Sequence, residues 1–410
     1  MSKNFKIETL EDVSGLGLVK GFKVAGVACN IRGNADLERL DVALICSDTP
    51  ATAAGVFTTN DVKAAPVYVD MEHLSRCGKV KAIVANSGNA NACTGERGLK
   101  DARDTCAYLA GKFGVDENQI LVCSTGRIGE FMPMEKLERG IDTAFSNLSD
   151  SDSASAAAAH AIMTSDTRPK TVISKVECGG KKFCVAGMAK GAGMIEPNMA
   201  TMLAFIASDV SIEQPRLKEI LRRAVSKTFN RISVDGDMST NDTVLCLCGG
   251  AGGVEIDGGD LEEAFEEALK SVCMSLARKI VGDGEKITRV VELKVKGARS
   301  AEQAEKICRS IGNSLLVKAS WYGGDPNWGR LTDSAGYART GIDFSKIDLD
   351  YNGTPVIIKG CPQSHNKELW RKIVNNKTFT INMNLNMGEF EDFLLTTDLT
   401  EAYVDFNKGE

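Results

Sequence analysis

The spacing of hydrophobic and polar positions predicts short strands that alternate with helices along most of the chain. Amphipathic or alanine-rich segments predict helices over 98–113, 134–148, 153–163, 214–229, 260–280 and 301–311. Short apolar or alternating runs predict strands over 81–85, 119–123, 171–176, 182–186, 201–208, 243–248, 289–295 and 315–320. This alternation favours an α/β or α+β architecture.

Turn signals and a change of pattern indicate how these elements are grouped. The runs 171–176 and 182–186 alternate at period two around Gly179-Gly180, which is typical of a β-hairpin. After Gly284 the pattern becomes strand, helix, strand and a strand-rich tail. A chain of 410 residues that is 43% hydrophobic can form about two domains. We therefore predict a larger α/β domain over 1–283 and a smaller α/β domain over 284–410.

Charge and composition narrow the range of partners. The net charge is −6 and Lys and Arg do not cluster, which argues against nucleic acid and anionic membranes and favours small molecules. The first residues contain no apolar targeting segment, and no run reaches the roughly 18 apolar residues of a membrane span, so we expect a cytoplasmic protein. The 13 cysteines include no C-x-x-C pair and the three histidines lie far apart, which predicts free thiols and no metal site.

One segment has the arrangement that self-cleavage requires. A glycine-containing loop from Lys190 to Ala200 leads directly into the apolar strand that begins at Thr201. The Thr201 hydroxyl can attack the Ala200 carbonyl, and hydrolysis of the resulting ester leaves Thr201 with a free α-amine. Such an amine has a pKa near 8 and can act as the base for its own hydroxyl. The alternative is an ordinary strand residue, because β-branched side chains suit a sheet.

A second segment allows two interpretations. Ser124-Thr125-Gly126 follows an apolar run and is either a simple turn or an oxyanion-binding site, since a hydroxyl and a backbone N–H at a strand end can stabilise a developing negative charge. The glycine-rich stretches 249–253 and 282–284 fit no phosphate-binding or dinucleotide-binding spacing, so loops are expected there.

The segment Lys190-Gly-Ala-Gly-Met-Ile-Glu-Pro-Asn-Met-Ala-Thr201-Met-Leu closely resembles the cleavage segment of the glutamate/ornithine N-acetyltransferase family, the ArgJ proteins. Further family-like stretches occur in the family's order over nearly the whole chain, at 54–60, 86–95, 162–167, 234–237, 239–243 and 325–330. The resemblance implies a DmpA/ArgJ-like fold with a second, smaller α/β domain.

The resemblance also implies roles for individual residues. Thr201 would be the acyl-carrying nucleophile and the first residue of a β chain, with residues 1–200 remaining bound as an α chain. Thr125 and Gly126 would form the oxyanion hole. The implied substrate-binding residues are Thr167, Lys190, Thr201, Glu285 and Asn407. A lysine suits the α-carboxylate of the substrates, and a glutamate suits the ammonium of ornithine.

The implied reaction belongs to arginine biosynthesis and has two steps. N2-acetyl-L-ornithine would acetylate Thr201, and L-glutamate would then take the acetyl group. Some family members also accept acetyl-CoA as a donor, whereas no bound cofactor or metal is implied. The processed chains of the family suggest an α2β2 assembly.

Departures from the family pattern leave alternatives open. Lys286 stands where the family usually has glycine, so Glu285 could also be a plain surface charge. The tail after Asn407 is short, and we expect one family substrate contact to be missing or replaced. One rival is a self-processing aminopeptidase or amidohydrolase on a related fold. The other is a non-catalytic chain that has lost processing.

Overall fold

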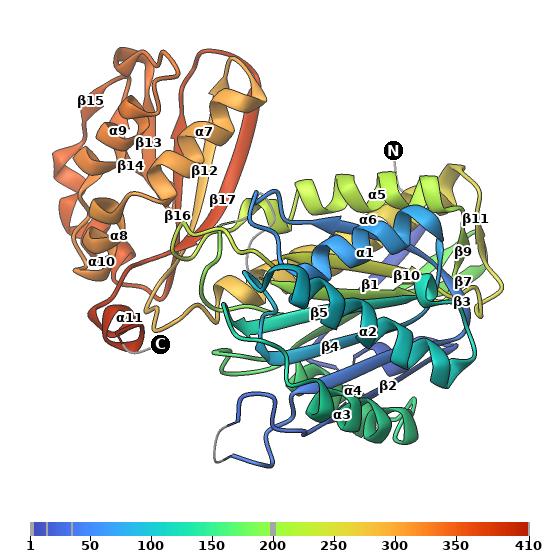
Figure 1. The fold of residues 1–410 in the computed structure, drawn as a ribbon. Helices are drawn as coiled ribbons and strands as arrows, with labels where there is room; N and C mark the ends of the chain where they lie inside the picture. Colours follow the sequence, from blue (N-terminus) through green and yellow to red (C-terminus); the bar gives the residue numbers. More distant parts are fainter. Residues whose placement is uncertain (1–3, 14, 34–35, 197–201, 409–410) are drawn as a thin grey trace. The chain divides into compact units, whose positions relative to one another are not determined.

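The computed structural model describes residues 4–13, 15–33, 36–196 and 202–408, and the chain forms two compact units (Figure 1). Unit 1 comprises Met1–Gly191, Pro197–Asn230 and Met238–Ile280, and unit 2 comprises Ala192–Glu196, Arg231–Asp237 and Val281–Glu410. Both units combine helices with sheets, which confirms the predicted α/β class. Ala200 and Thr201 lie outside the described residues.

Unit 1 is built on a nine-stranded sheet with the order β1-β6-β7-β8-β10-β3-β4-β5 and with β2 also paired to β3. Its strands are β1 (Phe5–Glu11), β2 (Phe22–Val27), β3 (Val42–Phe57), β4 (Lys79–Asn89), β5 (Ile120–Arg127), β6 (Lys170–Cys178), β7 (Lys181–Lys190), β8 (Leu203–Ser208) and β10 (Thr243–Cys248). The long strand β3 pairs with β10 through its second half, whereas β2 pairs with its first half. Its pairing with β4 shifts register between residues 46 and 51.

The two halves of this sheet face one another. One buried cluster joins Ile83 and Leu121, on β4 and β5, to Phe205 and Leu245, on β8 and β10. Apolar side chains of a sheet must be covered, and here the two halves cover each other because the sheet folds over at β3.

Helices cover the outer faces of the folded sheet and complete four layers. Helices α1, α2 and α3 contribute buried side chains to the cluster that also contains Val84 of β4 and Val122 of β5. On the other half, α6 packs so closely that a Cβ on Gly187 of β7 would meet Val272 at 2.8 Å. Figure 1 shows α5 along one side of the strands and α3 along the other. The helices are α1 (Ala65–Arg76), α2 (Gly95–Phe113), α3 (Met134–Ser146), α4 (Asp152–Ala161), α5 (Gln214–Ser226) and α6 (Gly259–Val281).

Shorter elements complete unit 1, and its predicted hairpin is confirmed. Strands β6 and β7 pair antiparallel through a turn in which Gly179 and Gly180 have φ of 55° and 79°. Positive φ at both turn residues matches the twist of a two-residue hairpin and explains the two glycines. The remaining elements are the 3₁₀-helices η1 (Leu16–Leu18), η2 (Glu117–Gln119) and η3 (Phe229–Arg231) and the paired strands β9 (Ser211–Ile212) and β11 (Glu255–Ile256).

Unit 2 contains a six-stranded sheet with the order β15-β14-β13-β16-β12-β17. Its elements are β12 (Val290–Ala298), α7 (Ala301–Gly312), α8 (Leu315–Tyr322), α9 (Trp328–Tyr337), η4 (Phe344–Lys346), β13 (Asp348–Tyr351), β14 (Thr354–Ile358), β15 (Cys361–Pro362), η5 (Ser364–Asn366), α10 (Lys367–Val374), β16 (Thr378–Asn384), β17 (Phe390–Thr397) and α11 (Glu401–Phe406). The helices and the sheet share one core, in which Trp321 packs edge-on against Phe379.

The predicted strand over 315–320 is wrong, because these residues form helix α8. The Ser314 hydroxyl caps this helix by accepting a hydrogen bond from the Val317 N–H. Val317 and Trp321, one helical turn apart, are both buried in the unit 2 core. A short apolar run fits a buried helix as well as a strand, so periodicity alone did not distinguish them. The tail also contains α9, α10 and α11 beside its strands.

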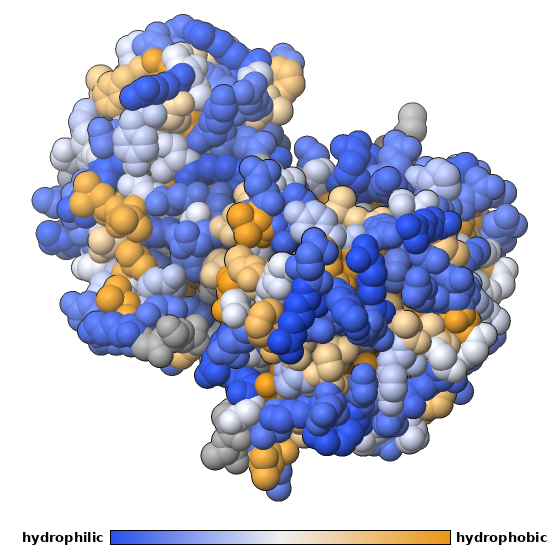
Figure 2. Space-filling view, viewed as in Figure 1, coloured by the Kyte–Doolittle hydropathy of each residue, from blue (hydrophilic) through white to orange (hydrophobic). Residues whose placement is uncertain are grey.

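The surface in view is mainly hydrophilic, with hydrophobic residues in small separated groups (Figure 2). Scattered groups of this size are ordinary for a folded domain. Among the residues that the structure describes, no helix is long and apolar enough to cross a membrane.

Candidate active site

The ends of strands β5 and β7 bring together the first pair of predicted site residues. Thr125 lies near the end of β5, and Lys190 is the last residue of β7. Lys190 Nζ donates a hydrogen bond to Thr125 Oγ1 over 3.2 Å, and both residues are buried. These strands are far apart in the strand order, so the contact depends on the folding of the sheet at β3.

Gly126 lies beside Thr125 at a position that only glycine fits. Its φ is 137°, and a Cβ at this position would meet the carbonyl carbon of Gly88 at 2.3 Å. Gly88 is its register partner on β4. The close approach of the two backbones fixes the direction of the chain after Thr125.

Asn241 holds this strand end in place, and the sequence analysis assigned no role to it. Its side-chain amide donates to the Ala90 carbonyl at 2.6 Å and to the Ser124 carbonyl at 2.8 Å. Ser124 in turn donates through its hydroxyl to Asn86 Oδ1 at 2.7 Å. All of these groups are buried, and each hydrogen bond satisfies a polar atom that burial would otherwise penalise.

Asp166 is a second residue that the sequence analysis missed. Its Oδ1 accepts from Lys170 Nζ at 2.5 Å and from the Gly191 N–H at 2.7 Å, and its side chain is fully buried. Burial alone would raise the pKa of this carboxyl, but the charges of Lys190 and Lys170 outweigh burial and lower the pKa to about 2. Asp166 is therefore a buried carboxylate that balances both lysines.

Asp242 is a third residue that the sequence analysis missed, and its buried carboxyl contacts Met202, which follows the predicted cleavage segment. Its Oδ1 accepts a hydrogen bond from the Met202 N–H at 2.9 Å. Burial raises the pKa of Asp242 well above its usual range, although the Met202 N–H, the charge of Lys190 and the Ser239 hydroxyl act in the opposite direction. Met202 is the first described residue after Thr201.

The other predicted site residues are Thr167, Ala200, Thr201, Glu285 and Asn407. Thr167 is exposed and directly follows Asp166 in the sequence. Ala200 and Thr201 lie outside the described residues. Glu285 and Asn407 belong to unit 2, where Asn407 Nδ2 donates to Glu285 Oε2 over 3.2 Å.

Glu285 also packs tightly against the segment 192–196 of unit 2. The Glu285 N–H donates to the Ala192 carbonyl at 3.0 Å. A Cβ on Gly193 would lie only 2.4 Å from the carboxylate oxygens of Glu285, so a larger residue there would displace the Glu285 side chain. The half-buried Glu285 is thus packed against neighbouring residues of unit 2.

Position 286, where a lysine stands in place of the glycine usual in the family, has a backbone conformation that glycine adopts easily. Lys286 has φ of 55°, in the left-handed region that favours glycine. Its carbonyl accepts a hydrogen bond from Thr400 Oγ1 at 2.7 Å, and its Nζ lies 4.9 Å from the centre of the Phe406 ring. The lysine therefore keeps the conformation and leaves the neighbouring Glu285 in contact with Asn407.

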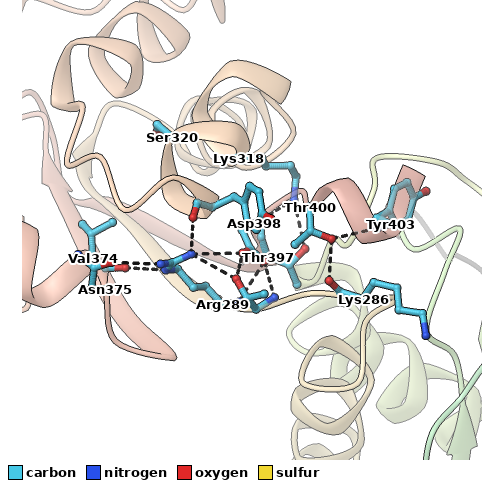
Figure 3. Close-up of polar contacts among 12 residues, drawn as sticks. Lys286, Arg289, Lys318, Ser320, Val374, Asn375, Thr397, Asp398, Thr400 and Tyr403 are labelled. Atoms are coloured by element: carbon cyan, nitrogen blue, oxygen red, sulfur yellow. Dashed lines mark hydrogen bonds and ion pairs between the residues drawn. The ribbon is translucent and has the colours of Figure 1, made fainter. Parts of the chain in front are cut away.

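A polar network anchors the chain on both sides of this turn (Figure 3). The fully buried Asp398 carboxylate accepts from the Arg289 N–H at 3.0 Å, and Arg289 Nε donates to the Val374 carbonyl at 2.8 Å. Lys318 Nζ donates to the Thr397 carbonyl at 2.7 Å, and burial lowers the pKa of Lys318 to about 8. The start of β12 and the segment that leads to α11 are thereby tied to one core.

Asp235 holds the segment that precedes the predicted cleavage site. Its carboxylate accepts from the Met194 N–H at 2.6 Å and from the Ile195 N–H at 2.8 Å. Glu196 forms an ion pair with Arg309 of α7 at 2.5 Å. Residues 192–196 are therefore bound to unit 2 by backbone and side-chain contacts.

Among the described residues, no group of three or more His, Cys, Asp or Glu side chains is arranged to hold a metal ion. The polar groups of the candidate site are a lysine, hydroxyls, amides and carboxyls, which are the groups that acyl transfer and amino-acid recognition use.

Comparison with known proteins places the chain in a family. A sequence profile of the ArgJ family matches residues 23–409. The arginine biosynthesis bifunctional protein ArgJ of Geobacter sulfurreducens is 43% identical over 95% of this chain and 98% of its own length. The glutamate N-acetyltransferase of Methanocaldococcus jannaschii is 42% identical over 96% of this chain and 97% of its own length.

A crystal structure of the arginine biosynthesis bifunctional protein ArgJ of Bacillus halodurans is 38% identical to the part of this chain that it matches. That match has a TM-score of 0.44 and covers 48% of this chain and 100% of that chain. The profile match and the two relatives, each extending over nearly the whole sequence, show that this chain belongs to the ArgJ family.

Proposed function

We propose that the protein is a glutamate N-acetyltransferase of arginine biosynthesis, which moves the acetyl group from N2-acetyl-L-ornithine to L-glutamate. The names of the relatives from Geobacter sulfurreducens and Methanocaldococcus jannaschii support both the pathway and the reaction. The observation that carries the proposal is the buried contact between Lys190, which opens the predicted cleavage segment, and Thr125 of the predicted oxyanion hole.

The first chemical event is self-cleavage between Ala200 and Thr201. It produces an α chain of residues 1–200 and a β chain that begins with Thr201. The hydrogen bond that fixes the Met202 N–H, on the residue directly after Thr201, supports this proposal, because an intramolecular attack needs a defined backbone beside the scissile bond.

Transfer then follows a ping-pong course through an acetyl ester of Thr201. The free α-amine of Thr201 accepts the proton of its own hydroxyl, which attacks the acetyl carbonyl of N-acetylornithine. Thr125 and the backbone N–H of Gly126 stabilise the oxyanion that develops on the acetyl oxygen. Ornithine leaves, and the amine of glutamate attacks the ester.

Substrate recognition is assigned to Thr167, Lys190, Glu285 and Asn407, together with Thr201. The Lys190 ammonium attracts the α-carboxylate that N-acetylornithine and glutamate share. The Glu285 carboxylate attracts the side-chain ammonium of ornithine, and the Asn407 amide orients that carboxylate through the bond that joins them.

Acetyl-CoA is a candidate second donor, and the word bifunctional in the name of the Geobacter relative favours it. The catalytic groups proposed here require no bound cofactor or metal. The processed chains are proposed to remain together as α2β2 in the cytoplasm.

The test is to incubate the purified protein with N-acetylornithine and glutamate, with and without acetyl-CoA, and to identify the products by mass spectrometry. Formation of N-acetylglutamate and ornithine in equal amounts supports the proposal. Release of acetate with no N-acetylglutamate would instead identify the rival hydrolase, and an unprocessed, inactive chain would identify the non-catalytic rival.

A further inference from the structure

Strand β5, which carries Thr125 and Gly126, is the last strand of the unit 1 sheet. It pairs with β4 on one side, and on its other side it has no neighbouring strand in the part of the chain that the structure describes. An open strand edge leaves N–H and C=O groups without ladder partners, and such groups need other partners when they are buried. The contacts along this edge therefore determine how firmly β5 is held.

Side chains of α1 bind to this open edge. His73 Nδ1 donates a hydrogen bond to the Ile120 carbonyl at 2.8 Å, and the Val122 N–H donates to Asp70 Oδ1 at 2.7 Å. Asp70 and His73 are three residues apart on the helix, so they share one of its faces. The two β5 residues that they contact are alternate residues, whose backbone groups point to the same side of a strand.

Asn241 extends this row of contacts by one further position. Its side-chain amide donates to the Ser124 carbonyl at 2.8 Å, which is the next group on the open edge. The same amide donates to the Ala90 carbonyl at 2.6 Å, in the segment that follows β4. The Ala90 N–H donates to the Arg127 carbonyl at 2.9 Å. Residues 125–126 are therefore held from both ends.

We propose that Asn241 is a positioning residue of acetyl transfer, which holds residues 125–126 at the place where the oxyanion develops. Asp70 and His73 act in the same way from further along the strand. The inference rests on the proposed function, in which Thr125 and Gly126 form the oxyanion hole.

Asn241 is itself held firmly enough for this role. It is 6% exposed, and its Oδ1 accepts a hydrogen bond from Thr240 Oγ1 at 2.6 Å. Its N–H donates to Ser239 Oγ at 3.0 Å, and its carbonyl accepts from Thr243 Oγ1 at 2.9 Å, at the start of β10. Strand β10 lies between β8 and β3 in the sheet order. Asn241 thus ties the edge strand β5 to an interior strand.

A positioning role has a kinetic signature that a loss of stability does not have. Oxyanion stabilisation depends on donors that are already in place when the charge develops, and a shift of about 1 Å can lower a rate about 100-fold. Ground-state binding depends less on these donors, so the loss should appear in the rates at saturating substrate. Acetylation and deacetylation of the enzyme both pass through an oxyanion, so both should slow by a similar factor.

The test measures the two half-reactions of the processed enzyme by rapid quenching and mass spectrometry. The first is acetylation of the enzyme by N-acetylornithine, and the second is deacetylation by glutamate. We expect Asn241→Ala to lower both saturated rates by about 10- to 100-fold. The half-saturating substrate concentrations should stay within about threefold of the wild type.

Gln214→Ala is the matched control. Gln214 Nε2 also donates to two main-chain carbonyls, those of Ala53 at 3.3 Å and Leu74 at 3.2 Å, and neither residue belongs to β5. Both variants should lower the temperature of thermal unfolding, but only Asn241→Ala should slow the half-reactions. Equal slowing in Gln214→Ala would show a general effect of looser packing and would overturn the inference.

Two variants of Asp70 keep the test decisive if Asn241→Ala fails to fold or to be processed. Asp70→Asn keeps an oxygen that can accept from the Val122 N–H, whereas Asp70→Ala leaves this N–H without its partner. We expect Asp70→Ala to slow both half-reactions about three- to tenfold, and Asp70→Asn to recover most of that loss. Equal rates in the two variants would overturn the inference.

Two results with Asn241→Ala would also overturn it. One is a pair of saturated rates within about threefold of the wild type, and the other is a change confined to substrate affinity or to a single half-reaction. The wild type separates these results from a failure of the proposed function. A wild-type enzyme that N-acetylornithine does not acetylate would refute the transfer itself, whereas normal wild-type transfer with unaffected variants would refute only the positioning role.

Discussion

Lys190 Nζ and Thr125 Oγ1 form a hydrogen bond of 3.2 Å although the two residues are 65 positions apart in the sequence. They lie on different halves of the unit 1 sheet, which meet because β3 takes part in both. Strand pairing at β3 thus determines whether the lysine of the cleavage segment reaches the predicted oxyanion hole.

Lys190→Ala should lower kcat/KM for N-acetylornithine by about ten- to a hundredfold, since a charge-assisted contact contributes roughly 1.5–3 kcal/mol. The kinetics must be measured on the processed fraction, because the change could also slow cleavage. Lys190→Arg should restore little of the lost kcat/KM, because the planar guanidinium places its charge differently from the lysine ammonium. Lys182→Ala, on the same strand but with a side chain that is 75% exposed, is the control and should behave as wild type. Unchanged turnover of processed Lys190→Ala would make Lys190 a structural residue.

Gly126→Ala should lose nearly all transferase activity and a large part of its stability. The added Cβ would lie 2.3 Å from the Gly88 carbonyl carbon, and φ at this position is 137°. Gly111→Ala is the comparison, because nothing lies within 4 Å of its Cβ position and alanine favours its helix. Thermal unfolding should show a gain of up to about 1 kcal/mol for Gly111→Ala. A Gly126→Ala protein with normal activity would rule out the rigid turn.

The two chains produced by cleavage should stay together without a covalent link. Strands β8 and β10 of the β chain pair with each other and with β7 and β3 of the α chain, so one continuous hydrogen-bonded sheet joins both chains. Size-exclusion chromatography in native buffer should give a single peak that contains both polypeptides, and denaturant should separate them. Separate elution in native buffer would contradict the observed strand order.

The free energy of unfolding should depend on pH in the acid range because of Asp166. Its pKa is lowered from 3.8 to about 2 in the folded protein, so its contribution is present above pH 4 and is lost as the pH falls towards 2. In the uncleaved Thr201→Ala background, Asp166→Asn should be less stable at pH 6. The difference from its parent should shrink by on the order of 2 kcal/mol between pH 5 and pH 2. A difference that is constant with pH in urea titrations would exclude this role.

The strands β1, β2 and β3, the helix α1 and most elements after residue 320 were not predicted individually. The other strands and helices followed largely from the spacing of hydrophobic residues. The helix α8 did not, because the Ser314 cap and the burial of Val317 and Trp321 depend on the tertiary core. The association of 192–196 and 231–237 with unit 2 has no local signal either. It arises from contacts such as those between Asp235 and the Met194 and Ile195 N–H groups.

The site residues that lie in recognisable motifs were predicted from the sequence, whereas those whose role depends on burial were not. Thr125 and Lys190 were found through the motifs that contain them, and the structure places them in contact. Asp166, Asn241 and Asp242 lie in polar stretches that were noted without a role, because aspartate and asparagine are usually exposed. Their importance comes from partners on distant strands, such as Gly191 for Asp166 and Met202 for Asp242.

The most direct test of the central claim is intact-mass and peptide analysis of the purified protein after incubation with N-acetylornithine alone, and then with glutamate. We predict two polypeptides, the second beginning Thr-Met-Leu-Ala-Phe and carrying one acetyl group on the hydroxyl of Thr201, which is lost when glutamate is added. Thr201→Ala should be neither cleaved nor acetylated, whereas Thr201→Ser should still be cleaved. An active protein that remains a single chain, or one that turns over with no acetyl group on the peptide that begins at Thr201, would contradict the account.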